Sequence, residues 1–205
     1  MISNKKLYLI TPEKIDTPTL FEQCLALIDT CPAFFQYRVK MVDPATKLHQ
    51  AKILLAHCRR AGVPFIVNDD WVLAKMIGAD GVHLGKDDVS ILQARAALGK
   101  TRIIGASCYG SIDRGVIALA DGADYIAFGA AFSSKSKPEA PCVSLSLYEE
   151  ARGRFPDAKI VAIGGITLDR APLLLDVGVD YLAVIGDIFD ADDPVARARA
   201  YENFA

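Results

Sequence analysis

The sequence GADYIAFG at residues 122–129 has two near copies in the chain, GADGVHLG at 78–85 and GVDYLAVIG at 178–186. In each copy, a glycine of the kind that ends helices is followed by an aspartate and then by an apolar run typical of a buried strand. We interpret the three copies as recurring joints between a helix and the next strand, not as binding sites. Such joints predict a chain of alternating helices and strands, in which the strands pair in parallel.

Short apolar segments rich in β-forming residues extend this pattern over the whole chain. Segments with helical periodicity separate them, for example ATKLHQAKILLAHCRRAG at 45–62. Strands that are apolar nearly throughout are typical of parallel sheets covered on both faces. The eight expected strands are KLYLI (6–10), AFFQY (33–37), PFIVN (64–68), DGVHL (80–84), RIIGA (102–106), DYIAF (124–128), KIVAI (159–163) and DYLAV (180–184).

Eight strand and helix units in 205 residues predict a (β/α)8 TIM barrel, with residues 1–205 as a single catalytic domain. The alternative is a doubly wound open sheet, which alternates in the same way. That fold usually carries a glycine-rich turn after its first strand, and LYLITPEK at 7–14 contains no glycine. We therefore favour the closed barrel.

Composition narrows the classes of partner. The 23 basic and 25 acidic residues are spread without blocks and leave a net charge of −2, which argues against nucleic acid and anionic membranes. No apolar run approaches the ~20 residues of a membrane helix, and MISNKKLYLITPE lacks the apolar core of a signal peptide. We expect a cytoplasmic protein that acts on small molecules. The sequence leaves its oligomeric state open and allows a homodimer.

The five cysteines show neither the paired spacing of a disulfide framework nor that of a zinc site. We expect Cys24, Cys31, Cys58, Cys108 and Cys142 to be small buried hydrophobic residues.

Charged residues follow several of the expected strands. Because TIM-barrel active sites lie at the C-terminal ends of the strands, Arg38, Lys40 and Lys137 should meet Asp69 and Asp88 at one mouth. A carboxylate pair among cations suits Mg²⁺, which takes one or two carboxylates together with substrate phosphate oxygens. The combination predicts a site for a diphosphate and Mg²⁺. The planar guanidinium of Arg38 can form two parallel hydrogen bonds to a phosphate, and the lysines can act on it as point charges.

A second anion site is predicted after the last two strands. Paired glycines Gly164 and Gly165 allow close backbone approach, and Ile185 and Gly186 follow the next strand, where many TIM barrels bind phosphate. The polar run SSKSK at 133–137 fits either a plain surface loop or a lid over the site, with hydroxyls at Ser134 and Ser136 that can bind a ligand.

Histidines do not contribute a metal site or a triad in this interpretation. His49 and His57 lie on the second helix, and His83 lies within the fourth strand, with no partner at metal-ligand spacing. No Ser-His-Asp arrangement can be assembled around Ser107, which fits better as a hydrogen-bond donor.

Taken in order, FQYRVK, FIVNDD, GADGVHLGKDD, IIGASCY, DYIAFGAAFSSKSKP, VAIGGIT and AVIG resemble the motifs of the thiamine phosphate synthase family. With LYLIT at the start, the resemblance covers nearly the whole chain. It implies a Mg²⁺-dependent transferase that joins a hydroxymethylpyrimidine diphosphate to a thiazole phosphate, releasing diphosphate. It also implies a dissociative step, in which diphosphate leaves before the thiazole nitrogen attacks.

The resemblance also implies roles for individual residues. The catalytic residues would be Arg38, Lys40 and Lys137, which stabilise charge on the departing diphosphate, together with Ser107 as a hydrogen-bond donor. Asp69 and Asp88 would bind Mg²⁺. The pyrimidine diphosphate would be held by Gln36, Arg38, Lys40, Asn68, Ser107 and Lys137, and the thiazole phosphate by Ser134, Ser136, Gly164, Gly165, Ile185 and Gly186.

Several positions depart from the family's usual pattern. Lys86 replaces a common glutamine, Ser134 and Ser136 replace threonines, Gly186 replaces a serine, and Tyr109 stands where many members carry histidine. Two alternatives to synthesis are a thiazole tautomerase paralogue, which would use that histidine, and a noncatalytic barrel that binds thiamine phosphates. The choice between a carboxylated thiazole phosphate and its decarboxylated form stays open.

Overall fold

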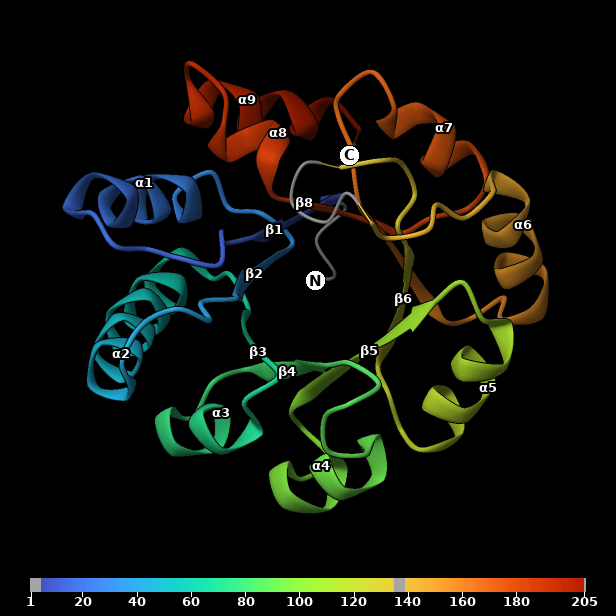
Figure 1. Cartoon of the computed structure of the whole chain (residues 1–205), viewed down its shortest axis with the longest axis horizontal. Coiled ribbons are helices and arrows are strands. Elements are labelled where there is room, and N and C mark those ends of the chain that lie inside the picture. The colour runs from blue at the N-terminus through green and yellow to red at the C-terminus, as the bar shows by residue number, and fades with distance from the viewer. Residues whose placement is uncertain (1–4, 135–138, 205) are drawn as a thin grey trace.

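Eight parallel strands close into one barrel, in which each strand pairs with the next and β8 pairs back to β1. This computed structural model describes residues 5–134 and 139–204. Helices form a ring outside the strands and follow one another around it in chain order (Figure 1). The predicted (β/α)8 barrel is confirmed, and the open sheet is excluded.

The strand bounds are close to those expected from the sequence. β5 is the exception, because it continues to Tyr109, so that Ser107 lies within the strand and not after it. The strands are β1 Leu7–Ile10, β2 Phe34–Tyr37, β3 Phe65–Asn68, β4 Gly81–Leu84, β5 Ile103–Tyr109, β6 Tyr125–Gly129, β7 Lys159–Ile163 and β8 Tyr181–Val184. The helices are α1 Pro18–Ile28, α2 Pro44–Ala61, α3 Trp71–Ile77, α4 Ile91–Leu98, α5 Ile112–Ala120, α6 Leu145–Arg154, α7 Ala171–Asp176, α8 Gly186–Phe189 and α9 Pro194–Ala200, followed by the 3-10 helix η1 Tyr201–Phe204.

Side-chain alternation along the strands divides the apolar residues into two cores. In β4, Val82 and Leu84 belong to the larger core between the barrel and its helices. In β6, Tyr125 and Ala127 belong to a smaller core that fills the barrel interior. Because successive strand residues point to opposite faces, a residue's position in its strand decides which core it joins.

The three sequence copies are helix-to-strand joints, as expected. The aspartates that precede β4, β6 and β8 each accept the backbone N–H of a residue in the preceding strand: Phe65 donates to Asp80, Ile104 to Asp124 and Ile160 to Asp180, at 2.7–2.9 Å. Each aspartate thus links the start of its own strand to the preceding strand, at the end of the barrel where the strands begin.

Two of these joints are each reinforced by a half-buried arginine. Arg95 of α4 donates to the carbonyl of Gly122 and pairs with Asp124. Arg152 of α6 donates to the carbonyl of Gly178 and pairs with Asp180 in the same way. Each guanidinium therefore ties a helix to the joint two elements further along the chain.

The five cysteines differ in how deeply they are buried. Cys24, Cys58 and Cys108 are buried as expected, and burial raises the pKa of Cys24 to about 12. Cys142 is exposed and Cys31 only half-buried, so the expectation was wrong for these two.

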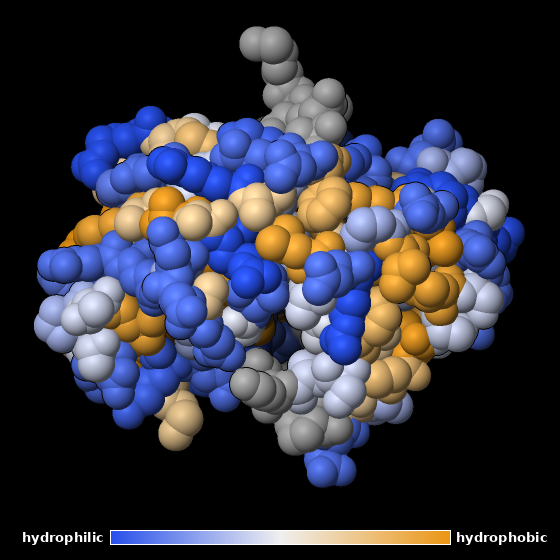
Figure 2. All heavy atoms as spheres, turned by 90° about the horizontal axis from the view of Figure 1, so that it is seen from above, coloured by the Kyte–Doolittle hydropathy of each residue, from blue (hydrophilic) through white to orange (hydrophobic). Residues whose placement is uncertain are grey.

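The face in Figure 2 mixes hydrophilic areas with hydrophobic ones. Within the described residues, no helix is long and apolar enough to cross a membrane.

The Asp180 joint gives a test of what stabilises the barrel. Burial opposes ionisation of Asp180, but hydrogen bonds from Ile160, Lys159 and Arg152 outweigh it and lower the pKa of the carboxyl. We expect Asp180→Asn to lower the free energy of unfolding at pH 7 by about 2 kcal/mol. A carboxylate with a depressed pKa stabilises above its unfolded pKa, so the difference from wild type should shrink below about pH 3.9.

Urea unfolding across this pH range measures the difference. Asp157→Asn is the matched control, because Asp157 is exposed and lies in the neighbouring turn. An equal loss in both variants at pH 7 would contradict the role given to the joint.

Candidate active site

Two adjoining cavities open at the C-terminal ends of the strands. The polar chamber, of about 310 Å³, lies over β2 to β5, and the wide chamber, of about 490 Å³, lies over β5 to β8. Arg38, Ser107, Tyr109 and Ile163 line both. The two chambers therefore form one mouth with a shared wall, in which two ligands can lie side by side.

Arg38 enters the polar chamber with its charge already balanced. The Arg38 side chain is only 10% exposed and pairs with Glu13 at 2.7 Å, while the Arg38 backbone N–H donates to the Thr11 hydroxyl at 2.8 Å. A buried charge needs such a partner. Glu13 was not among the residues proposed from the sequence. Its position after β1 is the sequence feature that points to it.

Asp69 and Asp88 both line the polar chamber, close enough for their carboxyl groups to interact. Burial raises the pKa of Asp88 and the charge of Asp69 raises it further, against the hydrogen bond from the Gly85 N–H at 2.6 Å. Lys40 lies 3.3 Å from Asp69. Two carboxylates this close favour a shared proton or a bound cation between them.

The backbone of Asp69 is held in an unusual conformation. Its φ of 62° lies in the left-handed region, which costs energy for a residue with a side chain. The Asp69 N–H donates to the carbonyl of His83 at 2.8 Å. The next residue, Asp70, caps α3 through Leu73 and pairs with Lys47 instead of facing the chamber.

The described residues contain no group of three or more His, Cys, Asp or Glu side chains that could hold a metal ion by themselves. Two carboxylates nevertheless fit Mg²⁺, because this ion usually completes its shell with water and substrate phosphate oxygens. The contact between Asp69 and Asp88 is the observation that makes the donor set suitable.

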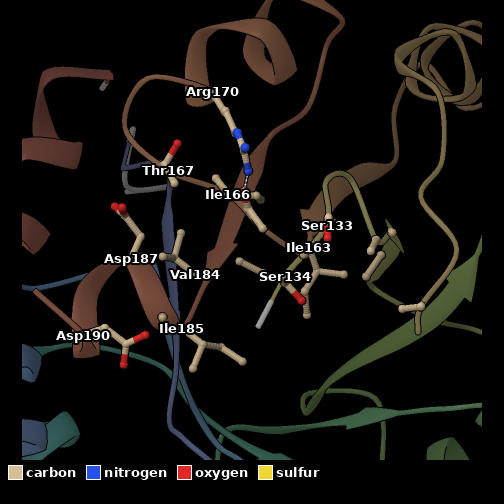
Figure 3. Close-up of a pocket in the computed structure, with 18 of the residues that line it drawn as sticks. Ser133, Ser134, Ile163, Ile166, Thr167, Arg170, Val184, Ile185, Asp187 and Asp190 are labelled. Atoms are coloured by element: carbon tan, nitrogen blue, oxygen red, sulfur yellow. Dashed lines mark hydrogen bonds between the residues drawn. The ribbon is translucent and has the colours of Figure 1, made fainter. Parts of the chain in front are cut away.

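The wide chamber is lined by tight backbone turns after β7 and β8 (Figure 3). Gly164 and Gly165 have φ values of 103° and 60°, and a Cβ on Gly165 would stand 2.4 Å from the carbonyl oxygen of Ser133. Arg170 donates to the carbonyl of Gly165 at 2.7 Å and stacks over the Phe132 ring. The glycine turn is therefore fixed from both sides.

Acidic side chains lie on the opposite wall of the wide chamber. Asp187 of α8 and Asp190, the residue that follows α8, lie on the other side of the chamber from Ile163 (Figure 3). Asp187 accepts from the Tyr201 hydroxyl at 2.8 Å and pairs with Arg197 at 3.4 Å. Its charge is thus partly balanced, and Asp190 lies beside Gly186, with an oxygen 3.2 Å from where a Cβ would be.

His83 is a residue of the mouth that the sequence interpretation left aside. Its Nε2 lies 2.8 Å from the Ser107 Oγ, and burial lowers its pKa to about 4. The alternation of side chains along β4 indicates this position in the sequence. Val82 and Leu84 face the helices, so His83 must face the barrel interior.

The structure brings most of the proposed residues to the mouth. The polar chamber contains Gln36, Arg38, Lys40, Asn68, Asp69, Asp88 and Ser107, and the wide chamber contains Ser107, Ser134, Gly164, Gly165, Ile185 and Gly186. Ser136 and Lys137 lie outside the described residues. Polar residues at the mouth that were not proposed from the sequence include Glu13, His83, Thr167, Arg170, Asp187 and Asp190.

Comparison with known proteins adds a family. A family model described as thiamine monophosphate synthase matches residues 7–188. The thiamine-phosphate synthase of Azoarcus sp. is 50% identical over 195 residues, covering 95% of this chain and 94% of the relative. That of Aromatoleum aromaticum is 51% identical over 195 residues, covering 95% and 93%.

Solved structures agree with the barrel. A thiamine phosphate pyrophosphorylase from Pyrococcus furiosus superposes with a TM-score of 0.87 at 29% identity, over 98% of this chain and 95% of that one. A 3-hexulose-6-phosphate synthase, at 17% identity and a TM-score of 0.67 over 97% of this chain and 99% of the other, shows the fold alone.

The glycine turn of the wide chamber can be tested directly. Gly165→Ala places a Cβ against two backbone carbonyls at a positive φ, so we expect the free energy of unfolding to fall by about 2 kcal/mol. Gly153→Ala is the control: it lies in α6 with open space around it, and alanine there should stabilise by about 0.5–1 kcal/mol. Chemical denaturation of both variants gives the comparison, and an unchanged Gly165→Ala protein would contradict the tight turn.

Proposed function

The chain belongs to the thiamine monophosphate synthase family, and we propose that the two chambers of its mouth each hold one substrate of that family's reaction. The enzyme is a thiamine-phosphate synthase, a transferase that joins 4-amino-2-methyl-5-(diphosphooxymethyl)pyrimidine to thiazole phosphate and releases diphosphate. The shared wall of the two chambers carries the proposal, since the reacting atoms must meet there. The names of the relatives favour synthesis over the tautomerase and storage alternatives.

The polar chamber suits the pyrimidine diphosphate. Arg38 offers a planar fork and Lys40 a point charge to the diphosphate, and Gln36, Asn68 and Ser107 offer hydrogen bonds to the ring. Lys137 joins this set in the proposal, although it lies outside the described residues.

Asp69 and Asp88 are the proposed Mg²⁺ ligands, together with oxygens of the diphosphate. When bound, the ion supplies positive charge that stabilises the diphosphate as it leaves. Lys40, which lies 3.3 Å from Asp69, can hold the Asp69 side chain in place and also reach a diphosphate oxygen.

The wide chamber suits the thiazole phosphate. Gly164 and Gly165 turn their backbone toward the cavity, and Ile185 and Gly186 complete the opposite rim. Ser134 and, outside the described residues, Ser136 add hydroxyls in the proposal. Because Gly186 lacks the hydroxyl common in the family, backbone N–H groups would carry more of the phosphate binding there.

The residues suit a dissociative reaction. The bond between the methylene carbon and the diphosphate oxygen breaks, the oxygen keeps the electron pair, and the thiazole nitrogen then forms the new bond to the carbon. No proton needs to be removed in this exchange, so the reaction needs no general base. Arg38 and Lys40 stabilise the developing charge on the leaving group, which is the largest contribution expected of such a site. Apolar side chains such as Ile163 keep water away from the pyrimidine cation that forms when diphosphate leaves.

The decisive experiment incubates the purified protein with the pyrimidine diphosphate, Mg²⁺ and either form of thiazole phosphate. We expect thiamine phosphate and diphosphate in equal amounts with the decarboxylated form, the carboxylated form, or both; the carboxylated form must also release its carboxyl group as CO2. Product is measured by chromatography and diphosphate by a coupled assay. No product with either thiazole would overturn the proposal.

The metal site has a test of its own. Asp69→Ala and Asp88→Ala should each raise the Mg²⁺ concentration for half-maximal turnover by about tenfold or more and lower turnover, because one ligand of the pair is lost. Asp70→Asn is the control: it removes the neighbouring charge that pairs with Lys47 yet leaves a side chain able to cap α3. Metal titrations of activity give the comparison, and unchanged Mg²⁺ dependence in both alanine variants would remove the two aspartates from the site.

A further inference from the structure

A continuous chain of side-chain hydrogen bonds crosses the barrel interior from one ligand-facing group to another. Gln36 Nε2 donates to the Tyr8 hydroxyl at 2.7 Å, and the Tyr8 and Tyr125 hydroxyls lie 2.6 Å apart. The Tyr125 hydroxyl lies 2.9 Å from His83 Nδ1, and His83 Nε2 lies 2.8 Å from Ser107 Oγ. We call these five residues the polar column.

The polar column is a built feature of the interior. Tyr8, Gln36 and Tyr125 are at most 2% exposed. Room for the Tyr125 ring comes from Gly105, where any Cβ would stand 1.9 Å from the ring. The Tyr125 and His83 rings are stacked, with centroids 5.6 Å apart. Such enclosure makes each hydrogen bond costly to lose and couples it to its neighbours.

One end of the polar column sets the direction of every bond in it. Tyr8 accepts from Gln36, so its own buried proton has a partner only if Tyr8 donates to Tyr125; the arrangement that leaves no buried hydroxyl proton unpaired therefore has Tyr8 as the donor. Tyr125 then donates to His83 Nδ1, so the proton of the neutral imidazole is on Nε2 and is donated to Ser107 Oγ. The Ser107 proton is left to point into the mouth.

The surroundings favour this direction over its reverse. With Nε2 turned inward, the carbonyl Oε1 of Gln36 is the end of the amide that faces the polar chamber, where Arg38 and Lys40 also lie. The reverse arrangement would turn the amide N–H groups toward those two cations. A partial negative charge beside them is electrostatically better than a partial positive one.

We propose that Tyr8, Tyr125 and His83 are positioning residues that fix the polarity of the polar chamber, with Gln36 as a hydrogen-bond acceptor and Ser107 as a donor. This rests on the proposed pyrimidine site. A 4-aminopyrimidine presents an amino donor beside a ring-nitrogen acceptor, which is the complement of that pair. A 4-oxopyrimidine presents an acceptor beside a ring N–H, which is the opposite. The polar column therefore selects the amino form of the substrate.

Calorimetry with the two pyrimidine diphosphates, in the presence of Mg²⁺ and without thiazole phosphate, measures this selection as a ratio of dissociation constants. We expect wild type to bind the amino form about 100-fold more tightly than the oxo form. Tyr125→Phe interrupts the polar column, lets Gln36 and Ser107 reorient independently, and should reduce the ratio at least tenfold. Tyr8→Phe interrupts it one bond away and should do the same, which covers a Tyr125→Phe protein that fails to fold.

The matched control is Tyr148→Phe. Tyr148 is fully buried and donates its hydroxyl to the carbonyl of Phe128 at 3.0 Å, outside the polar column. This variant loses a buried hydroxyl too, but should keep the wild-type ratio. An unchanged ratio in Tyr125→Phe and Tyr8→Phe, or an equal drop in Tyr148→Phe, would overturn the proposal.

The direction itself is visible in ¹⁵N spectra of the imidazole rings. The chain has three histidines, so His49→Gln and His57→Gln variants assign the His83 signals. We expect a neutral His83 protonated on Nε2 in wild type and Tyr148→Phe, and a mixture of tautomers in Tyr125→Phe. A His83 protonated on Nδ1 in wild type would overturn the assigned direction. Neither measurement needs turnover, so a protein that makes no product would count against the proposed function alone.

Discussion

The alternation of side chains along a closed set of parallel strands is the constraint on which the rest of this molecule depends. Every second residue of a strand must face the barrel interior, and the others must face the helices. The same rule that puts Val82 and Leu84 under the helices turns His83 inward. It also places Ser107 and Gly105 on the inner face of β5, with Ala106 and Cys108 outside. The site is thus an extension of the interior packing, with polar groups in place of apolar ones near one end.

Charge at the mouth is balanced before any ligand arrives. Arg38 is matched by Glu13 and Lys40 by Asp69, while Asp69 and Asp88 share one small volume. The pair with Glu13 keeps the buried Arg38 charge from being isolated, and both ion pairs hold long side chains in place. A diphosphate with its metal ion brings charges of both signs, so it can exchange partners with this set without leaving a buried charge unmatched.

The sequence predicted the barrel and most of the mouth, and the reasons are physical. Apolar strands repeated eight times leave few other folds, and parallel strands bring their polar ends together whatever the sequence between them. Arg38 and Asp88 could therefore be proposed from position alone. Glu13 also follows a strand, but its role was not evident, because that role depends on Arg38, which it meets at the end of the neighbouring strand β2. The link between Tyr8, Tyr125 and His83 was hidden for the same reason: those residues are far apart in the chain and look like ordinary interior residues one at a time.

The arginine and aspartate joints lie where the strands begin, and the two chambers lie where the strands end. Between them is a packed interior. This separation assigns heat tolerance and chemistry to different sets of residues. In lineages from hot or cold environments, substitutions that change thermal stability could therefore occur at the end where the strands begin, while the substrate-facing end changes little. It also gives a protein engineer a place to add stability without trading it against turnover.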